Sequence, residues 1–268
     1  MSDATSLGAP TLEETFARLA RDGRTALIAY LTCGFPDASV TPGALDALAE
    51  EGADVIELGV PFSDPLADGP VIQASSFRAL EGGMTVAGTL EVLRDFRRRH
   101  PTPVVIFTYL NPVLRYGLER FARDAREAGA QGILLTDLPA GADPEMESTL
   151  SDAGLDVVRL LAPTTPAGRI GAVATGGGGF VYYISRTGVT GTREALREGL
   201  LDEVSRLREA VSLPIAVGFG ISTADQARSV AGVADGVVVG SALIRALDED
   251  GVPGLRSLTA ALRAGVDG

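Results

Sequence analysis

One glutamate stands inside an apolar, strand-like run, and two aspartates follow it in a proline-rich turn. The segment 56–69 (I-E-L-G-V-P-F-S-D-P-L-A-D-G) contains Glu57, Asp64 and Asp68. Burying a carboxylate among apolar residues costs free energy, which favours a functional reason for its presence. Burial also raises the pKa of a carboxyl group, so Glu57 is a candidate general acid. Two alternatives stay open: Glu57 could be a structural partner of an arginine, and the aspartates could only form turns.

Two glycine-containing segments suit a phosphate ligand. Segments 218–222 (G-F-G-I-S) and 239–242 (V-G-S-A) each end an expected strand, and the second opens an expected helix. Gly220 and Gly240 permit close approach of the backbone, and Ser241 adds a hydroxyl donor. This pattern predicts a phosphate site at a helix N-terminus. The alternative is that the glycines only make tight turns.

A third segment, 185–191 (S-R-T-G-V-T-G), has the composition of a loop that closes over a ligand. Arg186 and Thr190 offer polar groups, and Gly188 supplies backbone freedom. A surface loop without function is the alternative. Near the ends of four expected strands, aromatic residues could form a slot for a flat apolar substrate, although core packing is the competing interpretation for each. They are Tyr30, Phe107, Tyr182 and Phe219.

Residues that are absent restrict the chemistry. The chain has no lysine, so its 23 basic residues are all arginine, and lysine Schiff bases or lysine-anchored pyridoxal phosphate are excluded. His100 is the only histidine and Cys33 the only cysteine, so we expect no Ser–His triad, no metal site and no disulfide. The net charge of −12 and the 5% aromatic content argue against nucleic-acid binding.

Alternating strand and helix patterns predict the elements that must position these residues. Eight β-branched-rich runs are expected as strands: 26–32, 54–60, 104–109, 132–137, 157–161, 180–185, 215–219 and 236–239. Continuous apolar strands separated by helices indicate a parallel sheet covered on both faces. Eight such units in about 250 residues predict an α/β fold, a (β/α)8 TIM barrel. A doubly wound sheet is less favoured, because no G-x-G-x-x-G turn follows the first run.

Further expectations concern boundaries. Thr11 and Glu14 fit a capping box that opens an extra N-terminal helix, and Thr41 before Pro42 fits an N-cap. We expect one domain over 1–268, with active-site loops at about 61–84 and 186–196 on the C-terminal face of the barrel. No apolar run reaches the roughly 20 residues needed to cross a bilayer, and no signal sequence is visible, so a cytoplasmic protein without membrane contact is expected.

Together these motifs resemble the tryptophan synthase alpha subunit family along nearly the whole chain. Segment 56–69 matches that family's signature without a mismatch, and five further segments follow in the family's order. These segments are 109–112 (Y-L-N-P), 162–166 (A-P-T-T-P), 185–191, 218–222 and 239–242. The resemblance implies a lyase that cleaves indole-3-glycerol phosphate, by a retro-aldol reaction, to indole and glyceraldehyde 3-phosphate in tryptophan biosynthesis.

The resemblance also implies roles for single residues. Glu57 would be the general acid–base at indole C3, Asp68 would stabilise the indolenine through the indole N–H, and Thr190 would position Asp68 on lid closure. The phosphate would be held by Gly191, Gly220, Gly240 and Ser241. The indole slot would be lined by Tyr30, Phe107, Leu134, Tyr182 and Phe219. No cofactor or metal is implied for this chain.

The partner implied by the resemblance is a pyridoxal-phosphate beta subunit, in an alpha2beta2 complex that passes indole through a tunnel. Family-like contact positions are Asp64, Pro65, Asn111 and Pro139. Two alternatives remain: a stand-alone indole-3-glycerol phosphate lyase with the same catalytic residues, and a catalytically silent phosphate-binding barrel with a regulatory role. Intact Glu57, Asp68 and Thr190 argue against the silent barrel.

Overall fold

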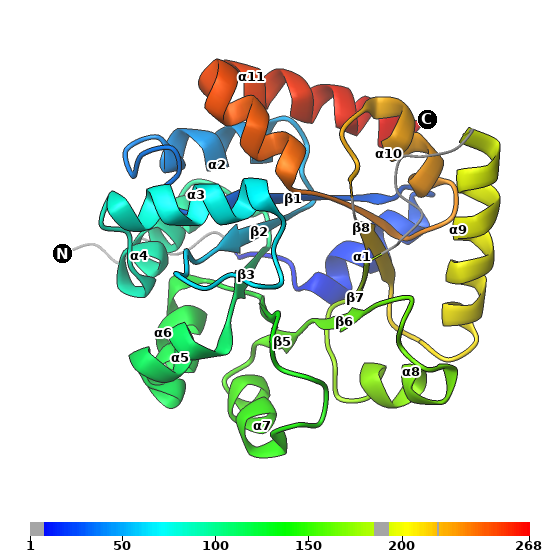
Figure 1. Cartoon of the computed structure of the whole chain (residues 1–268), viewed down its shortest axis with the longest axis horizontal. Coiled ribbons are helices and arrows are strands. Elements are labelled where there is room, and N and C mark those ends of the chain that lie inside the picture. The colour runs from blue at the N-terminus through cyan, green and yellow to red at the C-terminus, as the bar shows by residue number, and fades with distance from the viewer. Residues whose placement is uncertain (1–7, 185–192, 219) are drawn as a thin grey trace.

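The computed structural model describes residues 8–184, 193–218 and 220–268, and within these ranges eleven helices surround a sheet of nine parallel strands (Figure 1). The strands are β1 (Ala26–Thr32), β2 (Val55–Gly59), β3 (Val104–Thr108), β4 (Gly132–Leu135), β5 (Asp156–Val157), β6 (Arg159–Leu161), β7 (Val181–Ile184), β8 (Ile215–Gly218) and β9 (Gly236–Val239). The helices are α1 (Leu12–Arg21), α2 (Thr41–Glu50), α3 (Pro70–Glu81), α4 (Val86–Arg97), α5 (Leu110–Tyr116), α6 (Leu118–Ala128), α7 (Pro144–Asp152), α8 (Ala167–Ala174), α9 (Arg193–Arg208), α10 (Ala224–Ala231) and α11 (Ser241–Asp267).

The strands are arranged as a barrel. Their order across the sheet is β5-β4-β3-β2-β1-β9-β8-β7-β6, and only Val158 separates β5 from β6 in the chain. The backbone N–H of Val158 still donates to Ile133 on β4, whereas Arg159 is already in register with Val181 on β7. One strand was expected over 157–161, and two short ones are found because the chain changes its neighbour at Val158. The TIM-barrel prediction is confirmed.

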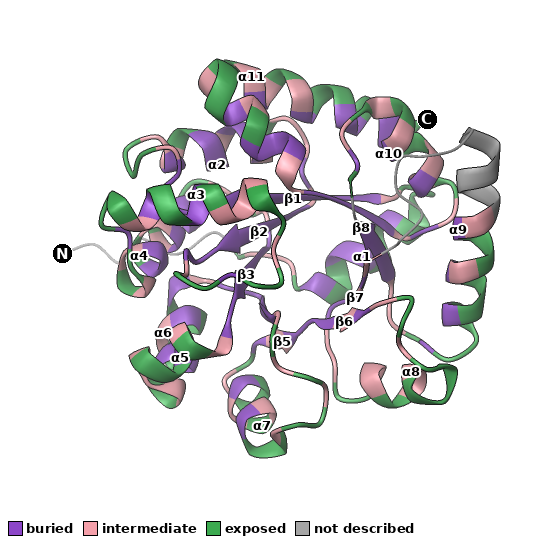
Figure 2. Cartoon of the chain, in the orientation of Figure 1, coloured by how far each residue is buried: buried purple, intermediate pink, exposed green. Residues whose placement is uncertain are grey.

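Burial follows the layers of the barrel. Every residue of β1, β2 and β3 is buried, as Figure 2 shows for the central strands, while the surrounding helices alternate buried and exposed faces. Strands covered on both faces require continuous apolar runs, which is why they were recognisable in the sequence. Within the described ranges, no helix is long and apolar enough to cross a membrane.

The expected N-terminal helix is present as α1. The Thr11 hydroxyl accepts from the Glu14 N–H at 3.1 Å, and the Glu14 carboxylate accepts from the Thr11 N–H at 2.8 Å, so the capping box is confirmed. The Phe16 ring lies 5.5 Å from the Phe180 ring, just before β7. Helix α1 therefore packs against the N-terminal end of the barrel, away from the carboxyl ends of the strands.

Three local expectations were wrong. The expected loop 186–196 extends too far, because helix α9 begins at Arg193. The connection 61–84 is not an uninterrupted loop, because helix α3 occupies its second half; Gly69 precedes α3, and Pro70 is its first residue. Proline is compatible with the first turn of a helix, whose N–H groups have no intrahelical acceptor. Thr41 is not an N-cap: Val40 holds that position, and the Thr41 hydroxyl accepts from the Gly34 N–H at 2.9 Å.

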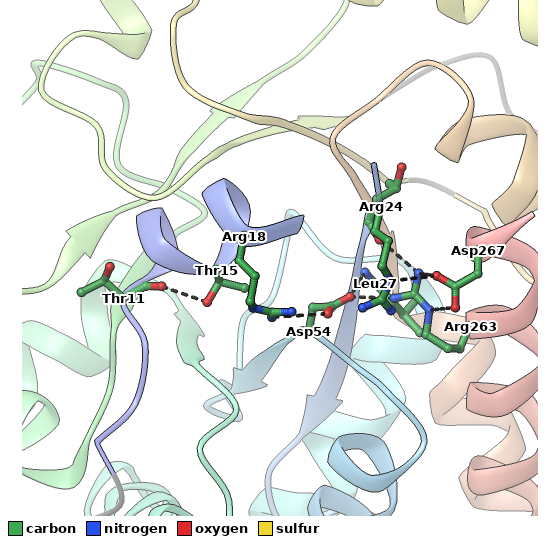
Figure 3. Close-up of polar contacts among 9 residues, drawn as sticks. Thr11, Thr15, Arg18, Arg24, Leu27, Asp54, Arg263 and Asp267 are labelled. Atoms are coloured by element: carbon green, nitrogen blue, oxygen red, sulfur yellow. Dashed lines mark hydrogen bonds and ion pairs between the residues drawn. The ribbon is translucent and has the colours of Figure 1, made fainter. Parts of the chain in front are cut away.

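A buried ion pair ties the end of α11 to the start of the barrel (Figure 3). Arg263 donates to Asp54 at 2.6 Å, to Asp267 at 2.7 Å and to the Thr25 carbonyl at 3.1 Å. Asp54 also accepts from the Leu27 N–H of β1 at 3.0 Å. The beginnings of β1 and β2 are thereby joined to the C-terminal part of α11, which begins at Ser241 and is kinked at Gly251.

Candidate active site

Glu57 is buried in the middle of β2. Its neighbours across the sheet are Tyr30 on β1 and Val105 on β3, and only 1% of the residue is exposed. Burial raises the pKa of Glu57 to about 8. Oε1 has no hydrogen-bond partner among the described residues. The alternative of a structural glutamate paired with an arginine is therefore not supported: the carboxyl group is protonated at neutral pH and has an unused oxygen.

Asp68 lies in the turn between β2 and α3, and Tyr109 holds it there. The Tyr109 hydroxyl donates to Asp68 Oδ2 at 3.0 Å and accepts from the Ala67 N–H at 3.0 Å. Gln73 donates to the Asp68 carbonyl at 2.9 Å. Partial burial raises the pKa of Asp68 to about 6, and the hydrogen bond from Tyr109 opposes that rise. At neutral pH Asp68 is therefore mainly ionised, whereas Glu57 is mainly protonated.

A chain of buried hydroxyl groups holds Tyr30 beside Glu57. Ser75 donates to the Ile72 carbonyl at 2.8 Å, so Thr32 donates to Ser75 at 2.7 Å, and Tyr30 in turn donates to Thr32 at 3.1 Å. The Tyr30 ring also makes an edge contact with Phe107, with centroids 5.1 Å apart. Burial raises the pKa of the Tyr30 hydroxyl, which stays neutral. This network connects β1 to α3 and orients the Tyr30 ring.

Glycines make room for two tyrosine side chains of the site. A Cβ at Gly59 would collide with the Tyr30 hydroxyl, and a Cβ at Gly218 would lie 2.7 Å from the Tyr182 ring. Each of these glycines ends a strand next to the strand that carries its tyrosine. Larger residues at either position would displace the aromatic side chain, so both glycines shape the site.

These residues surround one cavity of about 440 Å³ at the carboxyl ends of the strands. Of the predicted site residues, it is lined by Glu57, Asp68, Tyr30, Phe107, Tyr182, Gly220, Gly240 and Ser241. The structure thus brings together both expected carboxyl groups, three of the expected aromatic residues and part of the expected phosphate site. Leu134 is fully buried and does not line the cavity. Its position in the middle of β4, opposite Phe107, places it in the core.

The expected phosphate end of the cavity lies at the start of α11. Gly240 directly precedes this helix and Ser241 is its first residue, so the free N–H groups of the first turn are close to the cavity wall. Gly220 has φ +70°, which favours glycine. Ile72 and Arg245 line the same cavity. Such an arrangement can hold an anion at the helix terminus.

Several predicted residues lie outside the described part of the chain. They are Arg186, Gly188, Thr190 and Gly191 of the expected lid and phosphate site, and Phe219 of the expected indole slot.

The expected partner contacts divide into two groups. Asp64 and Asn111 are exposed and line one open hollow, together with Leu114. Pro139 is exposed and lines a different hollow, between the segments that follow β4 and β6. Pro65 is buried within its turn, where the adjacent Leu66 is 89% exposed instead.

Sequence reasoning assigned no role to Tyr109 and did not single out Arg245. Tyr109 was visible only as part of the motif 109–112, and it lies 41 positions from Asp68. Arg245 could have been found by its spacing, because residues four apart on a helix share a face and Ser241 was a predicted ligand.

Comparisons with known proteins agree with this geometry. The sequence pattern of the family described as "Tryptophan synthase alpha chain" matches residues 16–263. The tryptophan synthase alpha chain of Geobacter sulfurreducens is 51% identical over 231 residues, covering 86% of this chain and 88% of the relative. The tryptophan synthase alpha chain of Synechococcus elongatus is 46% identical over 257 residues, covering 96% of this chain and 97% of the relative.

Solved structures show the same similarity. A Mycobacterium tuberculosis tryptophan synthase chain superimposes with a TM-score of 0.88 at 40% identity, covering 97% of this chain and 99% of the other. The alpha subunit of tryptophan synthase from Legionella pneumophila superimposes with a TM-score of 0.88 at 36% identity, covering 96% of this chain and 98% of the other. With its barrel, its buried glutamate and its matched length, the chain belongs to the tryptophan synthase alpha chain family.

Proposed function

We propose that Glu57 is the general acid–base and Asp68 the charge-stabilising group in the family's lyase reaction, the cleavage of indole-3-glycerol phosphate to indole and glyceraldehyde 3-phosphate. The observation that carries this proposal is the pair of carboxyl groups in one cavity whose pKa values lie on opposite sides of neutrality, at about 8 and about 6. When the surroundings of two carboxyl groups in one site push their pKa values apart, one group typically acts as an acid and the other as an ionised stabilising group.

The reaction needs one proton to be given and one to be taken back. Protonated Glu57 would donate its proton to indole C3, which makes the ring cationic. The Asp68 carboxylate would accept a hydrogen bond from the ring N–H and stabilise that charge. The resulting Glu57 carboxylate would then remove the proton from the hydroxyl group on the carbon attached to C3. The C–C bond breaks, its electron pair returns to the ring, and an aldehyde is formed, so no cofactor is required.

The remaining cavity residues suit the two ends of this substrate. Tyr30, Phe107 and Tyr182 provide aromatic surface for the indole ring, and Gly240 with Ser241 provides N–H groups for the phosphate. We propose that the segment between β7 and α9 covers this cavity as a lid, with Arg186, Gly188 and Thr190, and that Gly191 and Phe219 complete the phosphate site and indole slot, as the family resemblance implies. The cytoplasmic location stays a prediction.

A beta subunit is the partner that we propose for this chain. The supporting observation is an open hollow in the surface where Asp64 and Asn111 lie beside Leu114, which is 48% exposed; Leu66, two residues after Asp64, is 89% exposed. Large exposed apolar side chains gathered at one face are typical of a protein interface. Pro139 would extend the same interface, and buried Pro65 would shape the turn.

The direct test is incubation of the purified chain with indole-3-glycerol phosphate and measurement of released indole. We expect release by the wild type and its abolition in Glu57→Gln, with an unchanged circular dichroism spectrum. Equal turnover by the variant would contradict the assigned role of Glu57, and absence of wild-type turnover with or without a beta subunit would favour the silent barrel. Strong stimulation by an added beta subunit would favour the subunit over a stand-alone lyase.

A further inference from the structure

A phosphorylated substrate brings more negative charge into the cavity than its ionised carboxylate already supplies, and the lining offers little positive charge against it. Of the cavity's two acidic residues, Glu57 is mainly protonated and Asp68 mainly ionised at neutral pH, and among the described residues that line it only Arg245 is basic. A phosphate monoester carries about −1.5 to −2 charges at pH 7. The whole chain adds a net charge of −12. Helix N–H groups alone offer only about half a positive charge, so a cation at the phosphate end would be needed to offset the repulsion.

Arg245 has the position of that cation. It follows Ser241 by four residues on α11, so the two side chains share one face of the helix. Helical side chains lean toward the N-terminus, which carries the guanidinium group back toward the first turn. Gly240, Ser241 and Arg245 all line the same cavity. Substrate phosphate at the start of α11 would therefore lie within reach of Arg245.

Arg245 is also not engaged elsewhere. Within the described residues it has no hydrogen bond or ion pair, and its side chain is exposed. The other arginines of α11 differ: Arg256 pairs with Glu50 and Glu51, and Arg263 pairs with Asp54. An arginine that faces a cavity without a carboxylate partner is available to an anionic ligand. Its planar guanidinium group can bind two phosphate oxygens at once.

We propose that Arg245 is a substrate-binding residue that supplies the positive charge for the phosphate group of indole-3-glycerol phosphate. The inference rests on the proposed function, because it assumes that this cavity holds that substrate. Arg245 has no part in the proton transfers at the indole ring. Its effect should therefore fall on ligands that contain phosphate and spare ligands that do not.

Calorimetric titration with the two reaction products tests this difference, because glyceraldehyde 3-phosphate contains phosphate and indole does not. In Arg245→Gln we expect the dissociation constant of glyceraldehyde 3-phosphate to rise about tenfold, the loss of one charge-assisted contact. The dissociation constant of indole should not change. Arg245→Lys should recover part of the affinity, because it keeps the charge but loses the bidentate geometry. In the wild type, added salt should weaken glyceraldehyde 3-phosphate binding more than in Arg245→Gln.

The matched control is Arg21→Gln. Arg21 is an exposed arginine in the last turn of α1, at the opposite end of the barrel, and the substitution removes the same charge. Normal glyceraldehyde 3-phosphate binding by Arg245→Gln, or an equal loss in Arg21→Gln, would overturn the proposal. Wild-type chain that binds neither product would instead overturn the proposed function, so the two failures are distinguishable.

Discussion

At the scale of single residues, two carboxyl groups in one cavity are made different by their surroundings. Glu57 is fully enclosed by strands and has an oxygen without a partner among the described residues, so burial favours its protonated form. Asp68 sits in a turn where Tyr109 donates a hydrogen bond to it, so its pKa rises less. The same functional group is therefore mainly protonated at one position and mainly ionised at the other, as the proposed roles of acid and stabilising charge require.

The pH dependence of kcat/KM should reflect both groups. The proposed mechanism requires ionised Asp68 and protonated Glu57, so kcat/KM should fall as the pH drops below about 6 and also as it rises above about 8. Measurement of indole release from pH 5 to 9 tests this bell shape. Activity that keeps rising above pH 8 would mean that protonated Glu57 is not required.

At the scale of elements, the turn between β2 and α3 is held by contacts from outside it. Tyr109, directly after β3, binds both Asp68 and Ala67, and Gln73 of α3 binds the Asp68 carbonyl. The Phe62 ring packs against Tyr109 with centroids 5.1 Å apart. A neighbouring strand end thus positions the Asp68 side chain, for which we propose a catalytic role, where the turn alone would leave it free.

Tyr109→Phe tests this positioning role. Without the hydroxyl donor, the pKa of Asp68 should rise above about 6, so the acidic limb of the kcat/KM profile should move to higher pH. We also expect kcat/KM at pH 7 to fall about tenfold, as for loss of one hydrogen bond to a charged group. Since the substrate phosphate also has a pKa near 6, a shift of this limb in the variant identifies Asp68 as its source.

The control for this prediction is Tyr183→Phe. Tyr183 also donates to a carboxylate, Glu203 at 3.0 Å, but it does not line the cavity. Its variant should keep the wild-type pH profile. An unchanged acidic limb in Tyr109→Phe would show that the hydrogen bond to Asp68 does not set the pKa of the working enzyme.

At the scale of the whole molecule, the barrel separates stability from chemistry. The cavity opens at the carboxyl ends of the strands, whereas the buried pair of Asp54 and Arg263 lies at their beginnings, where it joins β1, β2 and α11 (Figure 3). Side-chain exposure is 8% for Asp54 and 10% for Arg263, so the pair is little screened by solvent. Changes at this end should alter stability while the distant site keeps its arrangement.

Arg263→Met should lower the free energy of unfolding by about 3 kcal/mol, because it leaves the Asp54 carboxylate buried without its close cation. The comparison variant is Arg24→Ala, which breaks a more exposed pair with Asp267 at 3.2 Å and should cost less than about 1 kcal/mol. Urea unfolding of both variants provides the measurement. A cost for Arg263→Met as small as that of Arg24→Ala would show that the buried pair contributes little.

Much of this architecture could be predicted because it depends on patterns that are local in the chain. Apolar runs predicted the strands, since both faces of a parallel sheet are covered, and the spacing of Thr11 and Glu14 predicted the start of α1. The split between β5 and β6 could not be predicted. It depends on Val158 keeping its hydrogen bond to β4 while Arg159 pairs with β7. A change of neighbouring strand leaves no pattern in the local sequence.

The sequence by itself determined the chemical inventory: one glutamate within an apolar run, an acidic turn, a glycine–serine helix start and no lysine. Only the tertiary structure decided which of these groups meet and in what state. Tyr109 approaches Asp68 across 41 positions, Tyr30 fills the space left by Gly59, and Arg245 lies beside the cavity without an ion pair to any described residue. The physical reason is that pKa values and ligand contacts depend on distance and burial. Closure of the barrel fixes the distances between residues far apart in the chain and decides which of them are buried.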